Sequence, residues 1–403
     1  MGPPEAMMAR LALAIPTDLW EQEYAKIPYL RAMRQVELAR EAGHEIRAIE
    51  WIRRPVALPE RETREGVEVE RLYLRPPSTG LLARVASFRA ITDRVAERLA
   101  AARPDAIVCH DPELLPASVR ASRRTGSLLF YDAHEDFPAI AAEKSALEAA
   151  AFRWIERRAS RRADHVYVVA DGIRDRFAAW TPRVTTIRNA KPLAQTRVST
   201  PAAAVRSKLG FAPDDFVLAF TGSFSRERGI VEAMEALRHL PTDVKLLAIG
   251  GPQETLEELR ARAASLAVAS RVVFTGPLPV SGMFEALQVA DAGLVVYPPQ
   301  IAKYDHQAPN KLFDYMAMGL AIVASDRREI RRTAIDPGLA LGIPDIEPRT
   351  VANAVARLRD DPATRRDMGR RARLAFEREH CWERQRERLL ASHPFWRGEG
   401  APA

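Results

Sequence analysis

The sequence has few cysteines and no long apolar segment. Its two cysteines, Cys109 and Cys381, stand far apart and form no C-x-x-C pair, so neither a disulfide framework nor a zinc ribbon is expected. Apolar runs such as Leu128–Tyr131 are several times too short to cross a bilayer, and Leu11–Ile15 is too short for the core of a signal peptide. We therefore expect a cytoplasmic protein without a transmembrane helix.

Lysine is scarce although the chain is basic. Lys+Arg is 60 against Asp+Glu 53, a net charge of +7, yet only seven of the basic residues are lysine. Such an excess raises nucleic acid, an anionic membrane or a phosphorylated ligand as partners. An arginine-rich composition can equally reflect the codon bias of a high-GC genome, so the total charge does not choose among these partners.

Short β-branched runs alternate with segments of helical period along almost the whole chain of 403 residues. This alternation is typical of parallel sheets covered by helices. The aperiodic segment Lys191–Ala204 predicts a linker, after which the pattern starts again. We expect an α/β protein of two doubly wound, Rossmann-like domains, with the ligand site in the cleft between them. Long helices are predicted over Glu21–Ala42, Leu81–Arg103 and Ala139–Arg162.

Two motifs of nucleotide chemistry are missing. Neither the turn after Leu11–Ile15 nor the turn Thr221–Phe224 has the three glycines of G-x-G-x-x-G, which disfavours a nicotinamide or flavin enzyme. No D-x-D pair is present to hold a divalent metal on a nucleotide sugar. We therefore expect no metal and no cofactor, with diphosphate charge met by cations and helix dipoles.

The segment Tyr304–Asp326 carries the strongest local signal. Pro309 suits a helix start, and the free amides of the first turn, Asn310 to Leu312, could bind an anion. Lys311 falls in that turn, where a cation disfavours the helix unless an anion docks beside it. Asp314 follows on the same face and could accept hydrogen bonds from sugar hydroxyls. The alternative is a surface pair between Lys311 and Asp314.

In the first domain, polar side chains follow two predicted strands. His134 comes just after the strand Leu128–Asp132, so it should lie at a carboxyl end, where ligands bind; the alternative is a structural histidine. His110 and Asp111 end the preceding strand and could contact an acceptor or cap the next helix. Further candidates for acceptor contacts are Glu135 and Asp136.

The predicted helix Leu81–Arg103 is basic and amphipathic. It carries arginines beside an apolar stripe, so it could lie on an anionic membrane. Ordinary packing of that stripe inside the domain is the favoured interpretation.

Several segments, in order, resemble glycosyltransferase family 4. The strongest is "APNKLFDYMAMGLAIVASD", which follows "FTGSFSRERGI", "LLAIGG", "VVFTGPL" and "ALQVADAGLVVYPP". The first half matches through "RPDAIVCHDPELLP", "LLFYDAHEDFP" and "RRADHVYVVADGI", and the tail through "MGRRARLAFEREHCWERQRERLL". The resemblance covers about Arg10 to Leu390 and implies the GT-B fold, two Rossmann-like domains facing a central cleft. It implies an acceptor-binding domain at 1–195, a donor-binding domain at 196–380, and a terminal helix at 381–400 that crosses back onto the first domain.

The resemblance also implies roles for residues of the second domain. In the family motif G-R-x-x-x-x-K-G, which binds the donor diphosphate, Arg228 stands in the Lys place and Ser223, after Gly222, in the Arg place. Asp314 matches the second carboxylate of the E-x7-E motif, the ribose contact, whereas His306 replaces the first. Lys311 would then supply the lost phosphate cation. Leu278 matches the position that meets the nucleobase, and His134 the histidine beside the donor sugar.

With the motifs above, the resemblance implies a retaining, metal-independent transferase that moves a sugar from a UDP- or GDP-sugar to an acceptor. Catalysis would rest on His134, Arg228 and Lys311, because negative charge grows on the leaving diphosphate. The acceptor could be a cell-surface glycan, a lipid-linked sugar or a natural product, and 81–103 could contact the inner face of a membrane. The alternatives are a nucleotide-sugar 2-epimerase of the same fold and a non-enzymatic binder of membrane or nucleic acid; nucleic acid is not expected as a partner of the transferase.

Overall fold

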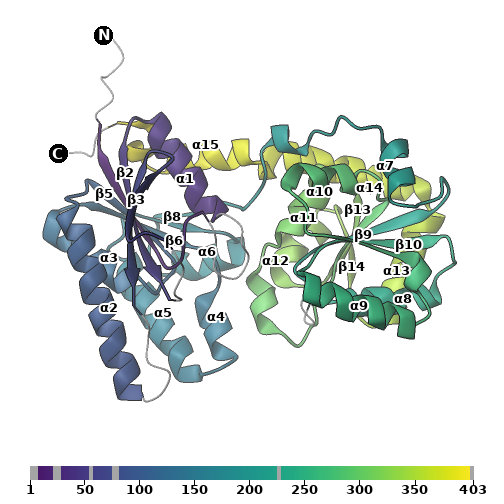
Figure 1. Cartoon of the computed structure of the whole chain (residues 1–403), viewed down its shortest axis with the longest axis horizontal. Coiled ribbons are helices and arrows are strands. Elements are labelled where there is room, and N and C mark those ends of the chain that lie inside the picture. Colours follow the sequence, from purple (N-terminus) through teal and green to yellow (C-terminus); the bar gives the residue numbers. More distant parts are fainter. Residues whose placement is uncertain (1–7, 21–28, 54–57, 75–80, 225–227, 400–403) are drawn as a thin grey trace, which may run out of the picture. The chain divides into compact units, whose positions relative to one another are not determined.

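The computed structural model describes residues 8–20, 29–53, 58–74, 81–224 and 228–399, without the side chains of residues 81, 82 and 84. The chain divides into two compact units (Figure 1). The first comprises Met1–Asn189 and Arg386–Ala403, and the second comprises Ala190–Gln385. Each unit is built on its own mainly parallel sheet covered by helices, so the prediction of two doubly wound α/β sheets is confirmed.

The sheet of the first unit has eight strands in the order β3-β4-β2-β1-β5-β6-β7-β8. Neighbouring strands are parallel, except that β3 pairs antiparallel with β4. The chain reverses its direction of travel between β1 and β5, which makes the carboxyl ends there a natural ligand position. The strands are β1 (Arg10–Ile15), β2 (Glu45–Ile52), β3 (Arg61–Arg64), β4 (Val67–Tyr73), β5 (Ala106–His110), β6 (Leu128–Ala133), β7 (His165–Val168) and β8 (Val184–Thr186), and the helices are α1 (Leu30–Glu41), α2 (Leu81–Ala101), α3 (Leu115–Thr125), α4 (Phe137–Ala142), α5 (Ala146–Ser160) and α6 (Asp171–Ala178).

The second unit has a six-stranded parallel sheet in the order β11-β10-β9-β12-β13-β14, with its reversal between β9 and β12. Its strands are β9 (Phe216–Gly222), β10 (Val244–Gly250), β11 (Val272–Gly276), β12 (Ala292–Val295), β13 (Ala321–Ser325) and β14 (Leu341–Ile343). Its α-helices are α7 (Ala202–Lys208), α8 (Ile230–Ala236), α9 (Gln253–Ser265), α10 (Val280–Leu287), α11 (Asn310–Ala317), α12 (Arg328–Ile330), α13 (Pro348–Asp360), α14 (Pro362–Ala375) and the first part of α15 (Trp382–Ser392).

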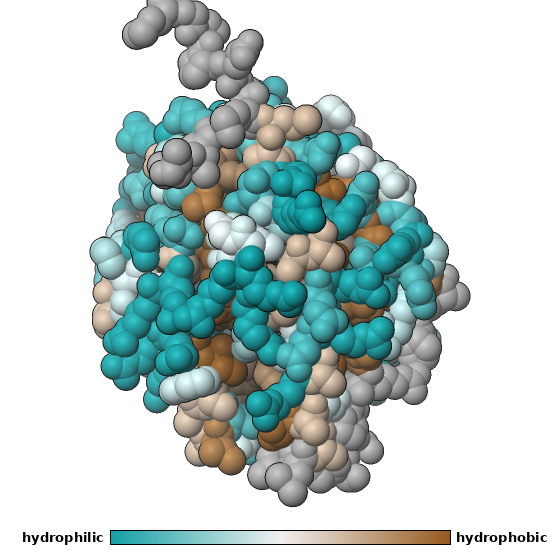
Figure 2. All heavy atoms as spheres, turned by 90° about the vertical axis from the view of Figure 1, so that its left-hand side faces the viewer, coloured by the Kyte–Doolittle hydropathy of each residue, from teal (hydrophilic) through white to brown (hydrophobic). Residues whose placement is uncertain are grey.

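Central strands are buried along their whole length. Every residue of β5 and of β12 is buried, as expected for parallel strands covered by helices on both faces. In α2 the stripe Ile91, Val95 and Leu99 is buried, whereas Val85 is 50% exposed. The packing interpretation of this helix therefore holds for its second half. On the face of the molecule seen in Figure 2, hydrophilic residues predominate and apolar residues form scattered spots.

Some details differ from the sequence expectation or lie outside the described residues. The single helix predicted over Ala139–Arg162 is wrong: α4 and α5 are separate, because Ser145 caps a new helix by accepting a hydrogen bond from the Glu148 amide at 3.2 Å. The strand β3 was not expected, since its sequence, "RETR", has only partly or fully exposed residues at the sheet edge. Helix α1 begins at Leu30, and the rest of the helix predicted from Glu21 lies outside the described residues.

The chain passes between the units at Asn189/Ala190 and at Gln385/Arg386, a few residues from the expected 195/196 and 380/381. The tail of the first unit is fixed by aromatic packing: the Trp396 indole donates to the Tyr167 hydroxyl at 2.7 Å, and its ring lies 5.6 Å from that of Phe130. The predicted helix 381–400 ends early, because α15 stops at Ser392 and a short 3-10 helix, Pro394–Arg397, carries Trp396 into the core. Within the described residues, no helix is both long and apolar enough to cross a membrane.

A close approach at Gly293 holds α11 against the second sheet. A Cβ at Gly293 would lie 2.3 Å from the Tyr315 ring, and the Tyr315 hydroxyl accepts from the Thr221 amide at 2.9 Å and donates to the Ala219 carbonyl at 3.2 Å. The second turn of α11 is thereby tied to the carboxyl end of β9.

We expect Gly293→Ala to lower the free energy of unfolding by about 1–3 kcal/mol, because the added methyl must displace the Tyr315 ring. Gly282→Ala is the matched control: it lies in α10, where its Cβ would meet Pro279 at an ordinary 3.5 Å. That change should be neutral or stabilise by about 0.5–1 kcal/mol. Urea unfolding measures both, and equal stability of the two variants would contradict the close packing described here.

Candidate functional site

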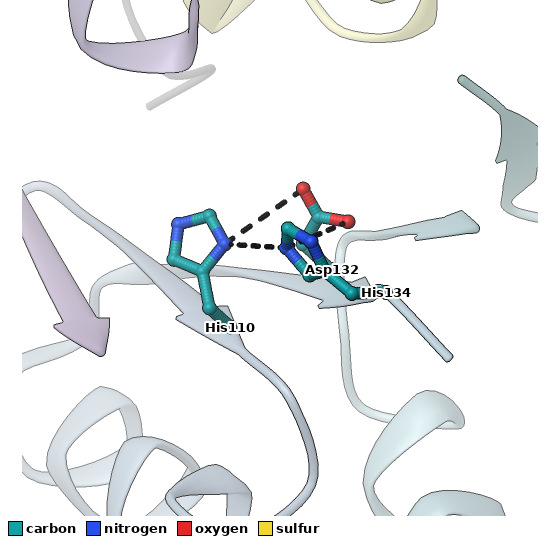
Figure 3. Close-up of side chains that lie close together, drawn as sticks. All are labelled: His110, Asp132 and His134. Atoms are coloured by element: carbon teal, nitrogen blue, oxygen red, sulfur yellow. Dashed lines mark hydrogen bonds and ion pairs between the residues drawn. The ribbon is translucent and has the colours of Figure 1, made fainter. Parts of the chain in front are cut away.

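In the first unit, two histidines and a carboxylate gather at the carboxyl ends of β5 and β6 (Figure 3). Nδ1 of His110 and Nε2 of His134 share a hydrogen bond of 3.0 Å. Asp132 lies beside both rings, at 3.9 Å from His110 Nδ1 and 3.7 Å from His134 Nε2. The three side chains are buried, so their charges are controlled by one another and by their neighbours.

Asp132 is neutralised from the neighbouring helix α1. Nε of Arg31 donates to one oxygen of Asp132 at 2.9 Å, and a second guanidinium nitrogen lies 2.7 Å from the other. Gln35, one turn further on, donates to the same carboxylate at 2.6 Å. Since this carboxylate is already bound by a guanidinium and an amide, a divalent cation would have to displace them. The donor set therefore fits a hydrogen-bonded cluster better than a metal site.

Burial and the Arg31 charge keep the two histidines neutral. Burial, the larger cause, and the nearby guanidinium lower the pKa of His110 to about 3. The pKa of His134 is lowered well below its usual value by burial, by Arg31 and by His110. Burial raises the pKa of Asp132, which Arg31 and Gln35 oppose. His134 can thus offer a neutral imidazole to a ligand rather than a positive charge.

Asp111 takes part in the same cluster and does not cap a helix. Its carboxylate accepts from the Tyr29 hydroxyl at 2.6 Å and from the His134 amide at 3.2 Å, while helix α3 begins later with Leu114 at its N-cap. The capping interpretation of His110 and Asp111 is therefore wrong. Asp111 has a φ of 61°, a conformation that costs energy for a residue with a side chain. Burial, followed by Glu113, raises the pKa of its carboxyl well above the usual value.

The other two acceptor candidates lie next to this cluster. Asp136 is buried and caps α4, accepting from the Ala139 amide at 3.4 Å, and it forms an ion pair with Arg176 at 3.4 Å. Glu135 is half-buried. Asp136 thus has a structural role, and acceptor contacts stay a prediction for both residues.

In the second unit, Lys311 is buried at the start of α11. Its Nζ lies 3.9 Å above the centre of the Phe220 ring and has no hydrogen-bond partner among the described residues. Burial and the nearby Arg228 lower the pKa of Lys311 well below its usual value. The alternative of an exposed pair between Lys311 and Asp314 is wrong, because both side chains are buried and Asp314 binds another lysine.

Arg228 lies near enough to Lys311 to act on its charge, and it precedes a glycine, Gly229, at which the chain closely approaches the end of β12. This glycine precedes α8 with a φ of 74°, and a Cβ there would lie 2.7 Å from the side chain of Val296, which follows β12. The half-buried Arg228 lies near the start of α11. Two cations therefore lie near each other at the ends of β9 and β12, the point where the strand order reverses.

The first turn of α11 offers fewer free amides than expected. Pro309 precedes the helix without a side-chain cap, and the Leu312 amide donates back to the Pro309 carbonyl at 3.0 Å. The predicted contribution of Leu312 is therefore wrong, because its amide is used in a turn and its side chain is in the core. Asn310 is exposed, and its amide and that of Lys311 have no backbone partner among the described residues.

Asp314 is held by a lysine that the sequence analysis placed in the linker. Nζ of Lys191 lies 2.7 and 2.9 Å from the two carboxylate oxygens. Burial raises the pKa of Asp314, and Lys191 opposes that rise. The acid is thus buried but paired, unlike Lys311.

The remaining predicted donor contacts surround the carboxyl ends of this sheet. Gly222, the last residue of β9, and Ser223, which follows it, are exposed, and a Cβ at Gly222 would meet nothing within 4 Å. Leu278 is 38% exposed in the turn after β11, and His306 is half-buried at the end of the 3-10 helix Ala302–His306, with no partner for its buried Nδ1 among the described residues.

Two family models match the chain and together cover most of it. Residues 30–190 match a glycosyl transferase 4-like domain, and residues 215–361 match the glycosyl transferases group 1 domain. The chain belongs to glycosyltransferase family 4. Its two sheets match those of other GT-B proteins, so the GT-B fold is confirmed as well.

Known proteins of this type are similar to the chain at low identity. D-inositol 3-phosphate glycosyltransferase of Nocardia farcinica is 28% identical over 212 residues, which cover 50% of this chain and 46% of that protein. The chain thus matches about half the length of that relative. Sucrose-phosphate synthase of Thermosynechococcus elongatus superposes with a TM-score of 0.74 at 17% identity, covering 95% of this chain and 100% of the other. HepE of Anabaena, solved in complex with UDP, superposes with a TM-score of 0.71 at 16% sequence identity, covering 96% of this chain and 99% of the other.

Several residues of this family 4 site were missed from the sequence. Tyr29 and Arg31 lie at the start of α1 and reach β5 and β6 only through the fold. Asp132 stood inside a motif that was noted for its histidine. Lys191 carried one usable signal, because lysine is rare in this chain and a lone lysine in a linker is unusual.

We expect neither His110 nor His134 to titrate near neutral pH, because burial and Arg31 lower both pKa values. Arg31→Met should raise both, since it removes a positive charge and leaves Asp132 unpaired, whereas Arg31→Lys should keep them low. NMR of the histidine ring protons as a function of pH measures this. His165, whose pKa is lowered to about 4 by burial, His393 and Arg183, is the internal control and should not move. Unchanged titration in Arg31→Met would contradict the assigned cause.

Proposed function

We propose that this family 4 protein is a retaining, metal-independent glycosyltransferase that uses a UDP- or GDP-sugar. The observation that carries the proposal is the buried Lys311, which has no hydrogen-bond partner among the described residues and lies near Arg228. A buried ammonium without a partner is costly, and a second cation nearby raises that cost. An anion that docks at the start of α11 would offset this cost.

A diphosphate suits this position. Arg228 can bind two oxygens of a phosphate with its guanidinium, and Lys311 can add a point charge. The amides of Asn310 and Lys311 lie at the positive end of the α11 dipole, so they would add to the attraction of a phosphate bound by Arg228 and Lys311. The open space at Gly222 and the exposed Ser223 would let a phosphate approach the end of β9.

In the proposed reaction the bond between the anomeric carbon and the diphosphate oxygen breaks, and the electron pair leaves with the diphosphate. Arg228 and Lys311 would stabilise that growing negative charge. The acceptor nucleophile forms the new bond to the anomeric carbon, and its proton passes to the leaving diphosphate oxygen. No step in this scheme calls for a metal, because the protein cations hold the leaving group.

The other contacts follow the family pattern. Asp314 would bind the ribose, Leu278 the base, and His306 and His134 the donor sugar. The neutral state of His134 supports a hydrogen bond to a sugar hydroxyl. The acceptor would lie against His110, Asp111, Glu135 and Asp136.

The acceptor class is open among glycans, lipid-linked sugars and natural products. One relative is named for inositol 3-phosphate and one structural neighbour for sucrose phosphate, so phosphorylated sugars and cyclitols belong among the compounds to test. For α2 we keep the proposal of a peripheral membrane contact, which the exposure of Val85 and Arg89 supports.

We expect Lys311→Met to weaken binding of UDP or GDP at least about tenfold, because one phosphate cation is lost. The same change should raise the free energy of unfolding by about 1–3 kcal/mol, since it replaces an unpaired buried amine with an apolar side chain. Calorimetry and urea unfolding measure the two effects. Lys208→Met, which removes an exposed lysine of α7, is the control and should change neither. Full nucleotide affinity in Lys311→Met would contradict the phosphate assignment.

Binding should also take up protons. The pKa of Lys311 is lowered in the free protein, so an anion that favours the charged form raises it, and affinity should fall as pH rises through the free-state pKa. Calorimetry in buffers of different ionisation enthalpy measures the protons bound. Uptake that persists unchanged in Lys311→Met would assign it to another group.

The reaction itself is tested with UDP- and GDP-sugars and a panel of sugar, cyclitol phosphate and lipid acceptors, with and without EDTA. We expect a product with the anomeric configuration of the donor, formed equally well with EDTA, because no metal holds the leaving group. NMR of the product reads the configuration. An inverted product, or loss of activity with EDTA, would contradict the corresponding part of the proposal. Conversion of the nucleotide sugar without an acceptor would favour the epimerase alternative.

A further inference from the structure

Lys191 and Asp314 form a buried pair at the donor helix. Nζ of Lys191 bonds both oxygens of Asp314, at 2.7 and 2.9 Å, and the two side chains are 13% and 5% exposed. No other side chain bonds this carboxylate among the described residues. The pair is therefore a specific contact and not a loose surface ion pair.

This geometry leaves free acceptor positions. A carboxylate has about four lone-pair sites, and Lys191 takes one on each oxygen. About one lone-pair site therefore remains on each oxygen. Two neighbouring hydroxyls, such as the 2′ and 3′ hydroxyls of a ribose, can each donate to one oxygen.

We propose that Lys191 is a positioning residue of the donor site, which holds Asp314 ionised and oriented for the ribose hydroxyls of a nucleoside diphosphate. The inference rests on the proposed function and adds to it a residue from outside α11. Lys191 acts through Asp314 and need not touch the donor.

The backbone of Lys191 is anchored independently of its side chain. Its carbonyl accepts from the Trp382 amide at 3.1 Å, and the Leu193 amide donates to Glu383 at 3.0 Å. The two segments that connect the units are thus bonded to each other within the second unit, next to Asp314. A change of the Lys191 side chain can therefore alter the carboxylate while the backbone keeps its place.

The other titratable groups near Asp314 are engaged elsewhere. Strands β12 and β13, which pack against α11, carry no titratable side chain. On α11 and on residues 376–380 beside it, Lys311 lies over Phe220, Tyr315 bonds Thr221, and His380 lies against Phe313. On α14, Arg373 bonds Glu377 and the Ala317 carbonyl, Arg365 pairs with Asp291, and Arg370 and Arg371 pair with Asp367. The other charged groups of these two segments, Arg366, Arg378 and Glu379, are exposed. Lys191 is the one whose charge opposes protonation of Asp314.

The test is calorimetry of the full chain with UDP and GDP, using whichever the wild type binds, from acid to alkaline pH. Lys191→Met should weaken binding about tenfold near neutral pH, and the ratio of its affinity to that of the wild type should recover as pH rises. The physical reason is that Asp314 without its lysine protonates more easily. Taking the ratio cancels the separate pH dependence of Lys311, which both proteins share.

Further variants separate positioning from folding. Lys191→Arg keeps the charge and should restore most of the affinity, and the 2′-deoxynucleotide should be less sensitive to Lys191→Met than the ribonucleotide. In an Asp314→Asn background, Lys191→Met should add little further loss, and this double variant has no unpaired charge. Lys245→Met is the matched control, since it removes the lysine of another Lys–Asp pair of the same unit, with Asp215 at 3.9 Å, and should bind like the wild type.

The outcomes distinguish the two proposals. A wild type that binds neither nucleotide overturns the proposed function and this inference with it. A wild type that binds, with Lys191→Met equal to it in affinity and pH profile, overturns only the role of Lys191. An undiminished effect of Lys191→Met in the Asp314→Asn background also overturns it, because Lys191 would then not act through Asp314.

Discussion

Burying charge at the carboxyl ends of parallel strands is the constraint on which both units depend. A doubly wound sheet brings strand ends and helix starts together, and the side chains there are screened from water by the surrounding loops. Each buried charge then needs a partner. Asp132 pairs with Arg31, and Asp314 pairs with Lys191. In both pairs the basic residue comes from a segment distant in sequence. Lys311 has no such partner among the described residues, which is why it points to a ligand.

The two clusters use their surroundings in opposite ways. In the first unit, burial and the guanidinium of Arg31 suppress protonation of His110 and His134, so a carboxylate, a guanidinium and two neutral rings form a cluster in which the charged groups are paired. In the second unit, Arg228 increases the cost of charging Lys311. The first cluster presents hydrogen-bonding groups of fixed charge. The second holds a buried amine without a negatively charged partner among the described residues, so it favours binding of an anion. The proposed reaction would use both, because it must orient a sugar and stabilise its leaving group.

Much of the fold was readable because its signals are local. Strand and helix alternation fixed the α/β class, since a buried parallel strand such as β5 must be apolar throughout. The exposed edge strand β3 and the break before Ser145 were missed, because a polar edge strand lacks a hydrophobic pattern and a capping residue inside a helical run is easily overlooked. Part of the candidate site could be predicted from the sequence, because His134, Arg228, Lys311 and Asp314 stand in motifs. The residues that pair with these clusters, such as Arg31 and Lys191, stand in no motif and could not be predicted.

The sequence by itself determined the family, the two sheets and the positions of the motif residues, because hydrophobic period and ordered short motifs are properties of neighbouring residues. Only the tertiary structure decided which charges are paired. It paired Asp314 with Lys191 rather than with Lys311, and it brought the guanidinium of Arg31 onto Asp132, beside the two histidines. The physical reason is that ion pairing depends on distance and burial, and the residues concerned are brought together only when the sheets form.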